Sequence, residues 1–208
     1  AGISVGPDGG SHQMLEDVAL MRGLPGMRVL VPADFAAARA AIKLAAATEG
    51  PVYVRMGRAA VPCVYDDEVE LEIGAAYVLR EGTDVTIVAN GVEIREALAA
   101  AEQLAAEGIS AEVIDAFSVK PLDAGTIGAS LAKTGCAVVA EEHSVMGGLG
   151  AAVCELACEG CPVPVELVGV RDRFGKSGEF EELLAYFSID AAAIVDAVKK
   201  AVSRKGVC

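Results

Sequence analysis

The sequence predicts an α/β fold built on a mainly parallel sheet. Through most of the chain, short segments rich in Val, Ile and Ala alternate with amphipathic segments of about 10 to 16 residues, as β-α-β units require. Apolar residues make up 53% of the 208 residues, and aromatic residues only 4%. Side chains this small let helices pack closely against a sheet. We therefore expect a large core in a three-layer arrangement.

The front of the chain, residues 1–63, predicts part of a separate α/β unit. Ala1–Val5 has the composition of a strand end, so we expect these residues to be the tail of a larger unit. Asp34 predicts a helix N-cap, and Gly50-Pro51 a helix stop. The elements expected here are a helix at Met14–Arg22, a strand at Arg28–Pro32, a helix at Asp34–Thr48 and a strand at Val52–Arg55.

An acidic, weakly periodic segment at residues 64–72 predicts a linker. Residues 73–208 then form the second unit. Its expected strands lie at Ala75–Leu79 (an edge strand), Val85–Ala89, Ala111–Ala116, Cys136–Ala140 and Val163–Val168. Its expected helices are one after Asn90-Gly91 that Gly108 ends, one from the N-cap Asp123 to Lys133, one that Gly147–Gly150 opens, and two at Phe180–Phe187 and Asp190–Ser203.

The formal charge of −13 argues against nucleic acid or an anionic membrane as partners, because both require a positive face. No apolar run approaches the roughly 20 residues of a membrane helix, and the sequence does not begin with a secretory leader. We expect a cytoplasmic protein. Its six cysteines are then reduced thiols rather than a disulfide framework.

Three of these cysteines, Cys154, Cys158 and Cys161, have the spacing that holds an iron–sulfur cluster in radical enzymes. However, the first two fall in a predicted helix of small apolar residues, and the third precedes a proline. Small buried thiols explain them equally well, and we favour that interpretation over a metal site.

The stretch Gly6–Gln13 is the segment with most chemistry. Its glycines and its proline disfavour a regular helix or strand, so the loop presents its side chains. They include Asp8, Ser11, His12 and Gln13, placed where a helix is about to begin, and a helix N-terminus suits an anionic or oxygen-rich ligand. The alternative is a structural turn capped by Ser11.

Arg55 and Arg58 follow the strand Val52–Arg55 at its carboxyl end, where open α/β sheets bind ligands. Two cations in so acidic a chain suit a phosphate or carboxylate. The alternative is a salt bridge to the acidic linker downstream.

Two further candidates are weaker. Gly147–Gly150 resembles a shortened phosphate-binding turn, but it lacks the dinucleotide spacing, so we expect helix–strand packing instead. Glu141 and Glu142 directly precede His143 and could form an acid–base pair, yet neighbours in an extended chain point apart. We interpret them as solvated or interface charges.

Several segments resemble transketolases. Gly6–Gln13 resembles a motif of the pyrimidine-binding domain, and four later segments are similar to the transketolase C-terminal domain: Leu79–Ala89, Val119–Asp123, Glu141–His143 and Val170–Gly178. The resemblance covers essentially the whole chain and is closest to split transketolases, whose catalytic unit is divided between two polypeptides. It implies part of a pyrimidine-binding α/β domain followed by the C-terminal domain.

This resemblance implies reversible transfer of a two-carbon ketol unit between sugar phosphates with thiamine diphosphate and Mg²⁺, as in the pentose phosphate pathway. Asp8 then recognises the hydroxyl next to the donor carbonyl. His12 lies near the aminopyrimidine of the cofactor and the reacting oxygen, where an imidazole can move a proton. Arg58 grips the substrate phosphate, and Arg55 is a candidate helper.

The resemblance also implies partners. The family's activating glutamate and the aromatic residues around the cofactor ring would lie upstream of Ala1, and the diphosphate–Mg²⁺ site belongs to another domain. We therefore expect an N-terminal transketolase subunit as partner, a homodimeric assembly and no turnover by this chain alone. The alternatives are a 1-deoxyxylulose-5-phosphate synthase, a 2-oxo-acid dehydrogenase beta subunit, and a non-catalytic dimerisation or docking module.

Overall fold

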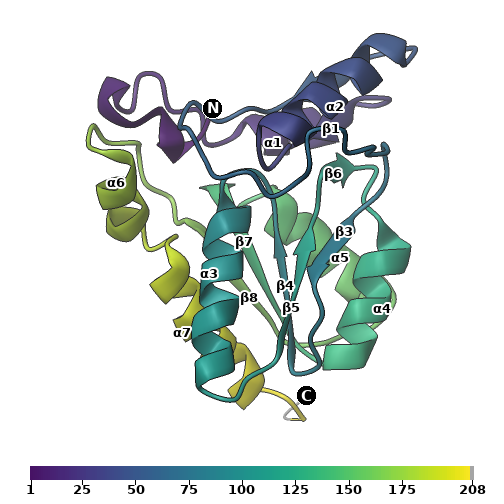
Figure 1. Cartoon of the computed structure of the whole chain (residues 1–208), viewed down its shortest axis with the longest axis vertical. Helices are drawn as coiled ribbons and strands as arrows, with labels where there is room; N and C mark the ends of the chain where they lie inside the picture. Colours follow the sequence, from purple (N-terminus) through teal and green to yellow (C-terminus); the bar gives the residue numbers. More distant parts are fainter. Residues whose placement is uncertain (207–208) are drawn as a thin grey trace.

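The computed structural model describes residues 1–206 and contains two sheets (Figure 1). The strands are β1 Arg28–Leu30, β2 Val52–Val54, β3 Tyr77–Arg80, β4 Val85–Ala89, β5 Ala111–Asp115, β6 Ser118–Lys120, β7 Ala137–Ser144 and β8 Val165–Val170. The helices are the 3-10 helix η1 Ile3–Asp8, α1 Asp17–Gly23, α2 Phe35–Ala47, α3 Glu93–Ala106, α4 Ala124–Thr134, α5 Leu149–Glu159, α6 Phe180–Phe187 and α7 Ala191–Ser203. Within this range, no helix is long and apolar enough to cross a membrane.

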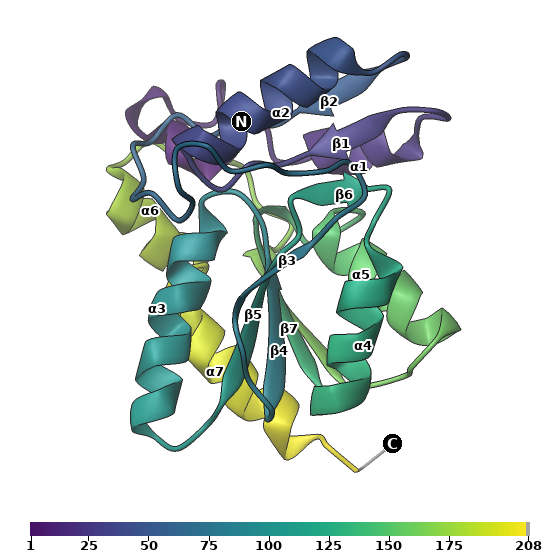
Figure 2. The same cartoon turned by 45° about the vertical axis from the view of Figure 1, so that its right-hand side comes forward.

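The larger sheet has the strand order β3-β5-β4-β7-β8 and is parallel except for β3. Helices α3 and α7 cover one face and α4 and α5 the other, which confirms the expected three-layer arrangement (Figures 1 and 2). The central strands β4 and β7 are buried along their whole length, as parallel strands between two helix layers must be.

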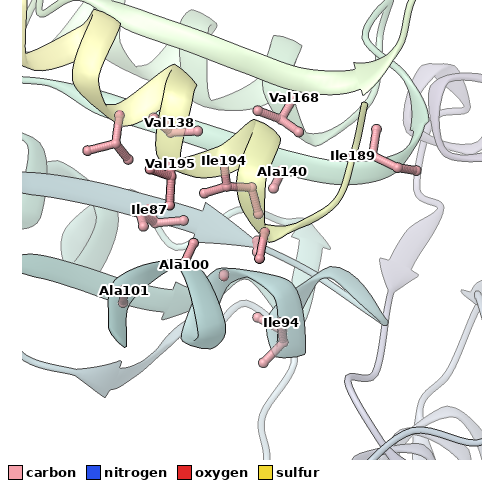
Figure 3. Close-up of a cluster of buried hydrophobic side chains, with 14 of the residues drawn as sticks. Ile87, Ile94, Ala100, Ala101, Val138, Ala140, Val168, Ile189, Ile194 and Val195 are labelled. Atoms are coloured by element: carbon pink, nitrogen blue, oxygen red, sulfur yellow. The ribbon is translucent and has the colours of Figure 1, made fainter. Parts of the chain in front are cut away.

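Successive side chains of the central strands point to opposite faces of the sheet, so these strands contribute to both helix–sheet interfaces. Ile87 and Val138 pack towards α3 and α7, whereas the next residues along, Val88 and Val139, pack towards α4 and α5. Figure 3 shows Ile194 and Val195 of α7 over the sheet face that carries Ile87 and Val138. Small residues of α3, Ala100 and Ala101 among them, keep the helix close to the sheet.

The smaller sheet, with strand order β2-β1-β6, joins the two halves of the chain, because β6 pairs antiparallel with β1. It lies beyond the carboxyl ends of β4 and β7, together with η1, α1 and α2 (Figures 1 and 2). The sequence did not predict β6. Three residues are too short for a periodic signal, and the pairing with β1 is long-range.

Three predictions about the elements were wrong. Ala1–Val5 is not a strand end, because Ile3–Asp8 form a 3-10 helix kinked at Gly6, where φ is 70°. The first helix begins at Asp17 rather than at Met14. The strand predicted to stop at Ala140 continues to Ser144, so Glu141–Ser144 lie in β7 and not in a loop.

Hydrogen bonds hold the first residues of the acidic segment 64–72 in place. Asp34 caps α2 and also accepts hydrogen bonds from the backbone N–H groups of Val64 (2.6 Å) and Tyr65 (2.9 Å). The Tyr65 hydroxyl in turn donates to Asp115 Oδ2 at 2.7 Å. This segment is therefore tied to both halves of the molecule at the carboxyl end of β5.

Candidate substrate-facing site

The Gly6–Gln13 loop is held against the segment that follows β8. Gln13 is buried, and its side-chain amide exchanges two hydrogen bonds with Lys176: the Lys176 N–H donates to Oε1 at 2.8 Å, and Nε2 donates to the Lys176 carbonyl at 3.0 Å. The expectation that this loop presents Gln13 to a ligand was wrong. Gln13 instead fixes the loop on which Asp8 and His12 lie.

Glycines let the two segments touch. A Cβ at Gly175 would lie 2.1 Å from Gln13 Oε1, and a Cβ at Gly10 would lie 2.9 Å from the Gly175 carbonyl oxygen. Gly9 has φ 74°, and a Cβ there would meet Ser177 Oγ at 2.2 Å. Side chains at these positions would push the segments apart, so the contact depends on glycine.

Asp8 and Arg58 meet at the exposed rim of this arrangement. Arg58 Nη1 donates to Asp8 Oδ2, although the two residues come from η1 and from the segment after β2. Their side chains are 60% exposed for Arg58 and 40% for Asp8. An ion pair this exposed contributes little stability, so both groups remain open to a ligand that offers a hydroxyl and an anion. The alternative partner for Arg58, the acidic linker, is not the one found.

His12 lies on the same loop and is exposed. Its Nδ1 is 3.0 Å from Ser11 Oγ, which orients the ring and leaves Nε2 for a ligand. The hydroxyl of Ser11 therefore serves the imidazole, and it does not cap α1, whose N-cap residue Glu16 makes no side-chain capping bond.

Arg55 is not at this rim. Its side chain is 2% exposed, and its guanidinium is saturated by Asp17 Oδ2 (Nε, 2.9 Å), Glu142 Oε1 (Nη1, 3.2 Å) and the Glu142 carbonyl (Nη2, 3.1 Å). The expectation that Arg55 helps to bind a phosphate is therefore corrected. Burial opposes its charge, but the carboxylates of Glu142 and Asp17 outweigh burial and raise the pKa of Arg55.

Asp17 and Tyr53 complete this cluster. The Tyr53 hydroxyl donates to Asp17 Oδ2 at 2.7 Å. Burial acts to raise the pKa of Asp17, yet the charge of Arg55 and the hydrogen bonds from Tyr53 and Arg55 lower it overall. Burial and the contact with Asp17 raise the pKa of Tyr53 to about 12. Asp17 thus stays an anion in the protein interior.

Glu141 and Glu142 point to opposite faces of β7, as expected for neighbours in a strand, but neither is a solvated charge. Glu142 Oε2 accepts from the Ser4 N–H at 2.8 Å, and Oε1 accepts from Ser4 Oγ at 3.2 Å. On the other face, Glu141 accepts from the N–H groups of Leu149 and Gly150, both at 2.8 Å. The sheet interior holds both carboxylates because each has donors to satisfy it.

The two hydrogen bonds to Glu141 cap the first turn of α5 and explain the turn Gly147–Gly150. The N–H groups that an anion would use are occupied by the Glu141 carboxylate, and a Cβ at Gly148 would lie 2.1 Å from Glu141 Oε2. A Cβ at Gly150 would press on Leu167 at 2.8 Å. The glycines therefore serve close helix–strand packing, as the sequence predicted, and not phosphate binding.

Cys154, Cys158 and Cys161 do not form a buried cluster. Cys158 is exposed, while Cys154 and Cys161 are half-buried, so the expectation of buried thiols holds only in part. Among residues 1–206, no three His, Cys, Asp or Glu side chains lie where they could hold a metal ion.

Sequence reasoning missed the buried polar cluster that Ser4, Asp17 and Glu142 form with Arg55. One signal was available for Glu142, because the alternation of β7 places it on the same face as Val138 and Ala140, which point into the core. The partners of Glu142 lie more than 80 residues away in the chain, and no local pattern identifies them.

Two family models match the chain, and together they span the fold and the site described above. Residues 1–64 match the transketolase pyrimidine binding domain, and residues 74–194 match the transketolase C-terminal domain. The chain belongs to the transketolase family. This confirms the resemblance and the fold expected from it.

Individual relatives and solved structures agree. The chain is 46% identical, over 98% of its length, to a 6-deoxy-6-sulfo-D-fructose transketolase subunit of Clostridium sp. (strain MSTE9), and 41% identical, over 93%, to an apulose-4-phosphate transketolase subunit of Phocaeicola vulgatus. A split-gene transketolase, solved as an inactive beta4 tetramer, superimposes with a TM-score of 0.92 at 51% identity over 94% of this chain and 64% of that one. The chain spans 63% and 62% of the length of the two curated relatives.

Proposed function

We propose that this chain supplies the substrate-facing side of a split transketolase, which transfers a two-carbon ketol unit between sugars that end in an anionic group. The observation that carries the proposal is the contact of Asp8 with Arg58 on an exposed rim, at the loop that also carries the exposed His12. A carboxylate, a cation and an imidazole are the groups that a hydroxylated, anion-ended sugar requires.

Each residue has a separate task in this proposal. Asp8 accepts a hydrogen bond from the donor hydroxyl next to the carbonyl. Arg58 binds the anionic end of the sugar, and in doing so it exchanges part of its contact with Asp8 for the ligand. His12, oriented through Nδ1 by Ser11, holds or moves a proton at the reacting oxygen through Nε2.

The cofactor thiamine diphosphate is assigned mainly to a partner. When bound, it supplies the carbon nucleophile that opens the bond next to the carbonyl. In this chain, we assign His12 to the polar edge of the aminopyrimidine ring, because this residue is exposed and its Nε2 is unused by Ser11. The described residues include no set of three metal ligands that would fit Mg²⁺, so we assign the diphosphate and Mg²⁺ to an N-terminal subunit and derive no step through them here.

The relatives support an anionic sugar. One is named for a 6-deoxy-6-sulfo-D-fructose and the other for apulose 4-phosphate, and both names specify a sugar with a negatively charged end group. Both relatives are transketolase subunits, which supports an obligatory partner. We propose a homo-oligomer of such pairs as the working enzyme.

The test is a mixture of this chain with the N-terminal transketolase subunit of the same organism, thiamine diphosphate and Mg²⁺. Xylulose 5-phosphate is the donor, and an aldose phosphate is the acceptor that takes up the two-carbon unit. Replacing Asp8, His12 or Arg58 by Ala should each lower kcat/KM about 10- to 100-fold, as expected for a lost charged hydrogen bond. Arg80→Ala, on edge strand β3 away from the rim, is the matched control and should leave kcat/KM unchanged. Full activity of Arg58→Ala would contradict the proposal.

A further inference from the structure

We infer that Glu142 is a positioning residue for the substrate-facing pair, setting the distance between Asp8 and Arg58 through Ser4 and Arg55. This inference deepens the proposed function and rests on it. Glu142 lies on β7, in the C-terminal domain, whereas Asp8 and Arg58 both come from the front of the chain.

Glu142 holds the segment that carries Asp8. Both carboxylate oxygens of Glu142 accept hydrogen bonds from Ser4, one from its backbone N–H at 2.8 Å and one from its hydroxyl at 3.2 Å. Gly2 brings the backbone close, since a Cβ there would lie 2.3 Å from the Glu142 carboxyl carbon. Ser4 and Asp8 lie on either side of the kink at Gly6 in η1. Gln13 Nε2 lies 3.4 Å from both the Ile3 and the Gly6 carbonyl oxygens, so fixing Ser4 limits where the short segment to Asp8 can lie.

Glu142 also holds the segment that carries Arg58. Arg55 Nη1 donates to Glu142 Oε1 at 3.2 Å, the same oxygen that Ser4 Oγ reaches. Gly57, the residue before Arg58, packs on this point, because a Cβ there would lie 3.0 Å from Ser4 Oγ and 3.6 Å from Glu142 Oε1. The Glu142 carboxylate therefore contacts both the segment that leads to Asp8 and the segment that leads to Arg58.

Burial makes this arrangement rigid. The side chains of Glu142 and Arg55 are each 2% exposed, so neither can exchange its partner for water without a large cost. Asp17 holds the other side of the Arg55 guanidinium and begins α1, which follows the Gly6–Gln13 loop. The cluster thus fixes the segments before and after the loop, and Glu142 links them to the larger sheet. None of these residues needs to touch substrate.

The experiment compares two donors in the reconstituted two-subunit enzyme, with one common acceptor: D-xylulose 5-phosphate and D-xylulose. In Glu142→Gln the paired charge is lost, and an amide N–H replaces an oxygen that faces donors. We expect kcat/KM to fall about tenfold more for the phosphorylated donor than for D-xylulose, because both donors have the hydroxyl that meets Asp8 and only one has the phosphate that meets Arg58. A purely structural role would reduce the amount of active enzyme and lower both values equally.

Glu166→Gln is the matched control. Glu166 is also a buried, ion-paired glutamate on a neighbouring strand, β8, where it binds Lys200 and Arg204. This variant should leave the ratio of the two kcat/KM values at the wild-type level. If Glu142→Gln does not fold by circular dichroism, Ser4→Ala removes only the hydroxyl contact and should lower the ratio about threefold.

The outcomes distinguish a failure of the positioning role of Glu142 from a failure of the proposed function. An unchanged ratio in folded Glu142→Gln, or in Ser4→Ala where that variant replaces it, overturns the inference and leaves the proposed function standing. Absence of ketol transfer in the wild-type mixture contradicts the proposed function and the inference with it. A selective loss for the phosphorylated donor supports both.

Discussion

The side-chain amide of Gln13 pairs with the main chain of Lys176 through two hydrogen bonds, of 2.8 and 3.0 Å, across 163 residues of sequence. Gln13 thereby joins the front loop, which carries Asp8 and His12, to the segment between β8 and α6. The C-terminal domain thus does more than support the sheet, since it also holds the loop that we place at the substrate.

Gln13→Ala should therefore loosen the loop. The N–H and carbonyl of Lys176 lose their partners in a part-buried place, which costs about 1–3 kcal/mol of the free energy of unfolding. Urea denaturation measures this loss. Gln103→Ala, at an exposed position of α3, is the control and should change the free energy of unfolding by less than about 0.5 kcal/mol. Equal stability of the two variants would show that the contact does not hold the loop.

Gly175→Ala tests the same contact from the other side. The new Cβ would lie 2.1 Å from Gln13 Oε1 and 2.9 Å from Gly10 Cα, so the segments must separate. We expect a loss of about 1–3 kcal/mol, typical of overpacking, and a lower melting temperature in calorimetry. Gly128→Ala in α4, where a Cβ meets no atom within 4 Å, should stabilise the protein by up to about 1 kcal/mol through helix propensity. A Gly175→Ala variant as stable as wild type would contradict the close approach.

Asp115 predicts a pH dependence of stability. Burial raises the pKa of Asp115 from 3.8 to about 7, although the hydrogen bond from Tyr65 acts to lower it. The folded protein therefore binds this proton more tightly than the unfolded chain does, and stability falls as the pH rises from about 4 through about 7. At 1.36 kcal/mol per pH unit, the fall attributable to Asp115 is about 4 kcal/mol.

Asp115→Asn should remove this part of the pH dependence. Chemical denaturation at several pH values measures the free energy of unfolding of both proteins. Relative to wild type, the free energy of unfolding of the variant should increase between pH 5 and pH 8. Asp67→Asn, at an exposed position of the acidic segment, should leave the profile of the wild type unchanged. A constant difference between Asp115→Asn and wild type at all pH values would rule out the assigned titration.

Glu93 should behave as a neutral acid. It is fully buried at the start of α3, and neither of its carboxylate oxygens has a hydrogen-bond partner among the described residues. Burial first, and the negative charge of Glu142 second, raise the pKa of Glu93 well above its ordinary value. Protonation then stabilises the fold at low pH, and this stabilisation is lost as the pH rises towards the raised pKa.

Glu93→Gln replaces a protonated acid by a neutral amide of similar shape. The free energy of unfolding of the variant should equal that of the wild type near pH 5 and exceed it at pH 8. Glu102→Gln, at an exposed position of the same helix, is the control and should show no such change with pH. A Glu93→Gln variant that is less stable than wild type at pH 8 would mean that the carboxylate is charged and needed.

The sequence predicted the elements whose causes are local. Asp34, predicted as an N-cap, accepts from the Ala37 N–H at 2.8 Å, and Asp123 does the same for Thr126 at 2.9 Å. The buried strand Val85–Ala89 was predicted with its observed limits, because a continuous β-branched run is a strong signal. These features depend on neighbours within a few residues.

The features that the sequence did not predict depend on distant partners. Glu142 follows another glutamate and precedes a histidine, a local pattern typical of an exposed segment, and only Ser4 and Arg55 explain its burial. Arg55 and Arg58 look alike in sequence. The fold places one inside against two carboxylates and the other at the rim, and only Arg58 remains in our proposed site.

The central claim is that this chain supplies the substrate-facing side of a ketol transferase and needs a partner for turnover. The most direct test is ketol transfer from xylulose 5-phosphate to an aldose phosphate, with thiamine diphosphate and Mg²⁺ present. It is measured for this chain alone, for the N-terminal subunit alone and for their mixture. We predict turnover in the mixture and in neither subunit alone. Turnover by this chain alone, or a mixture that forms a complex without turnover, would contradict the account.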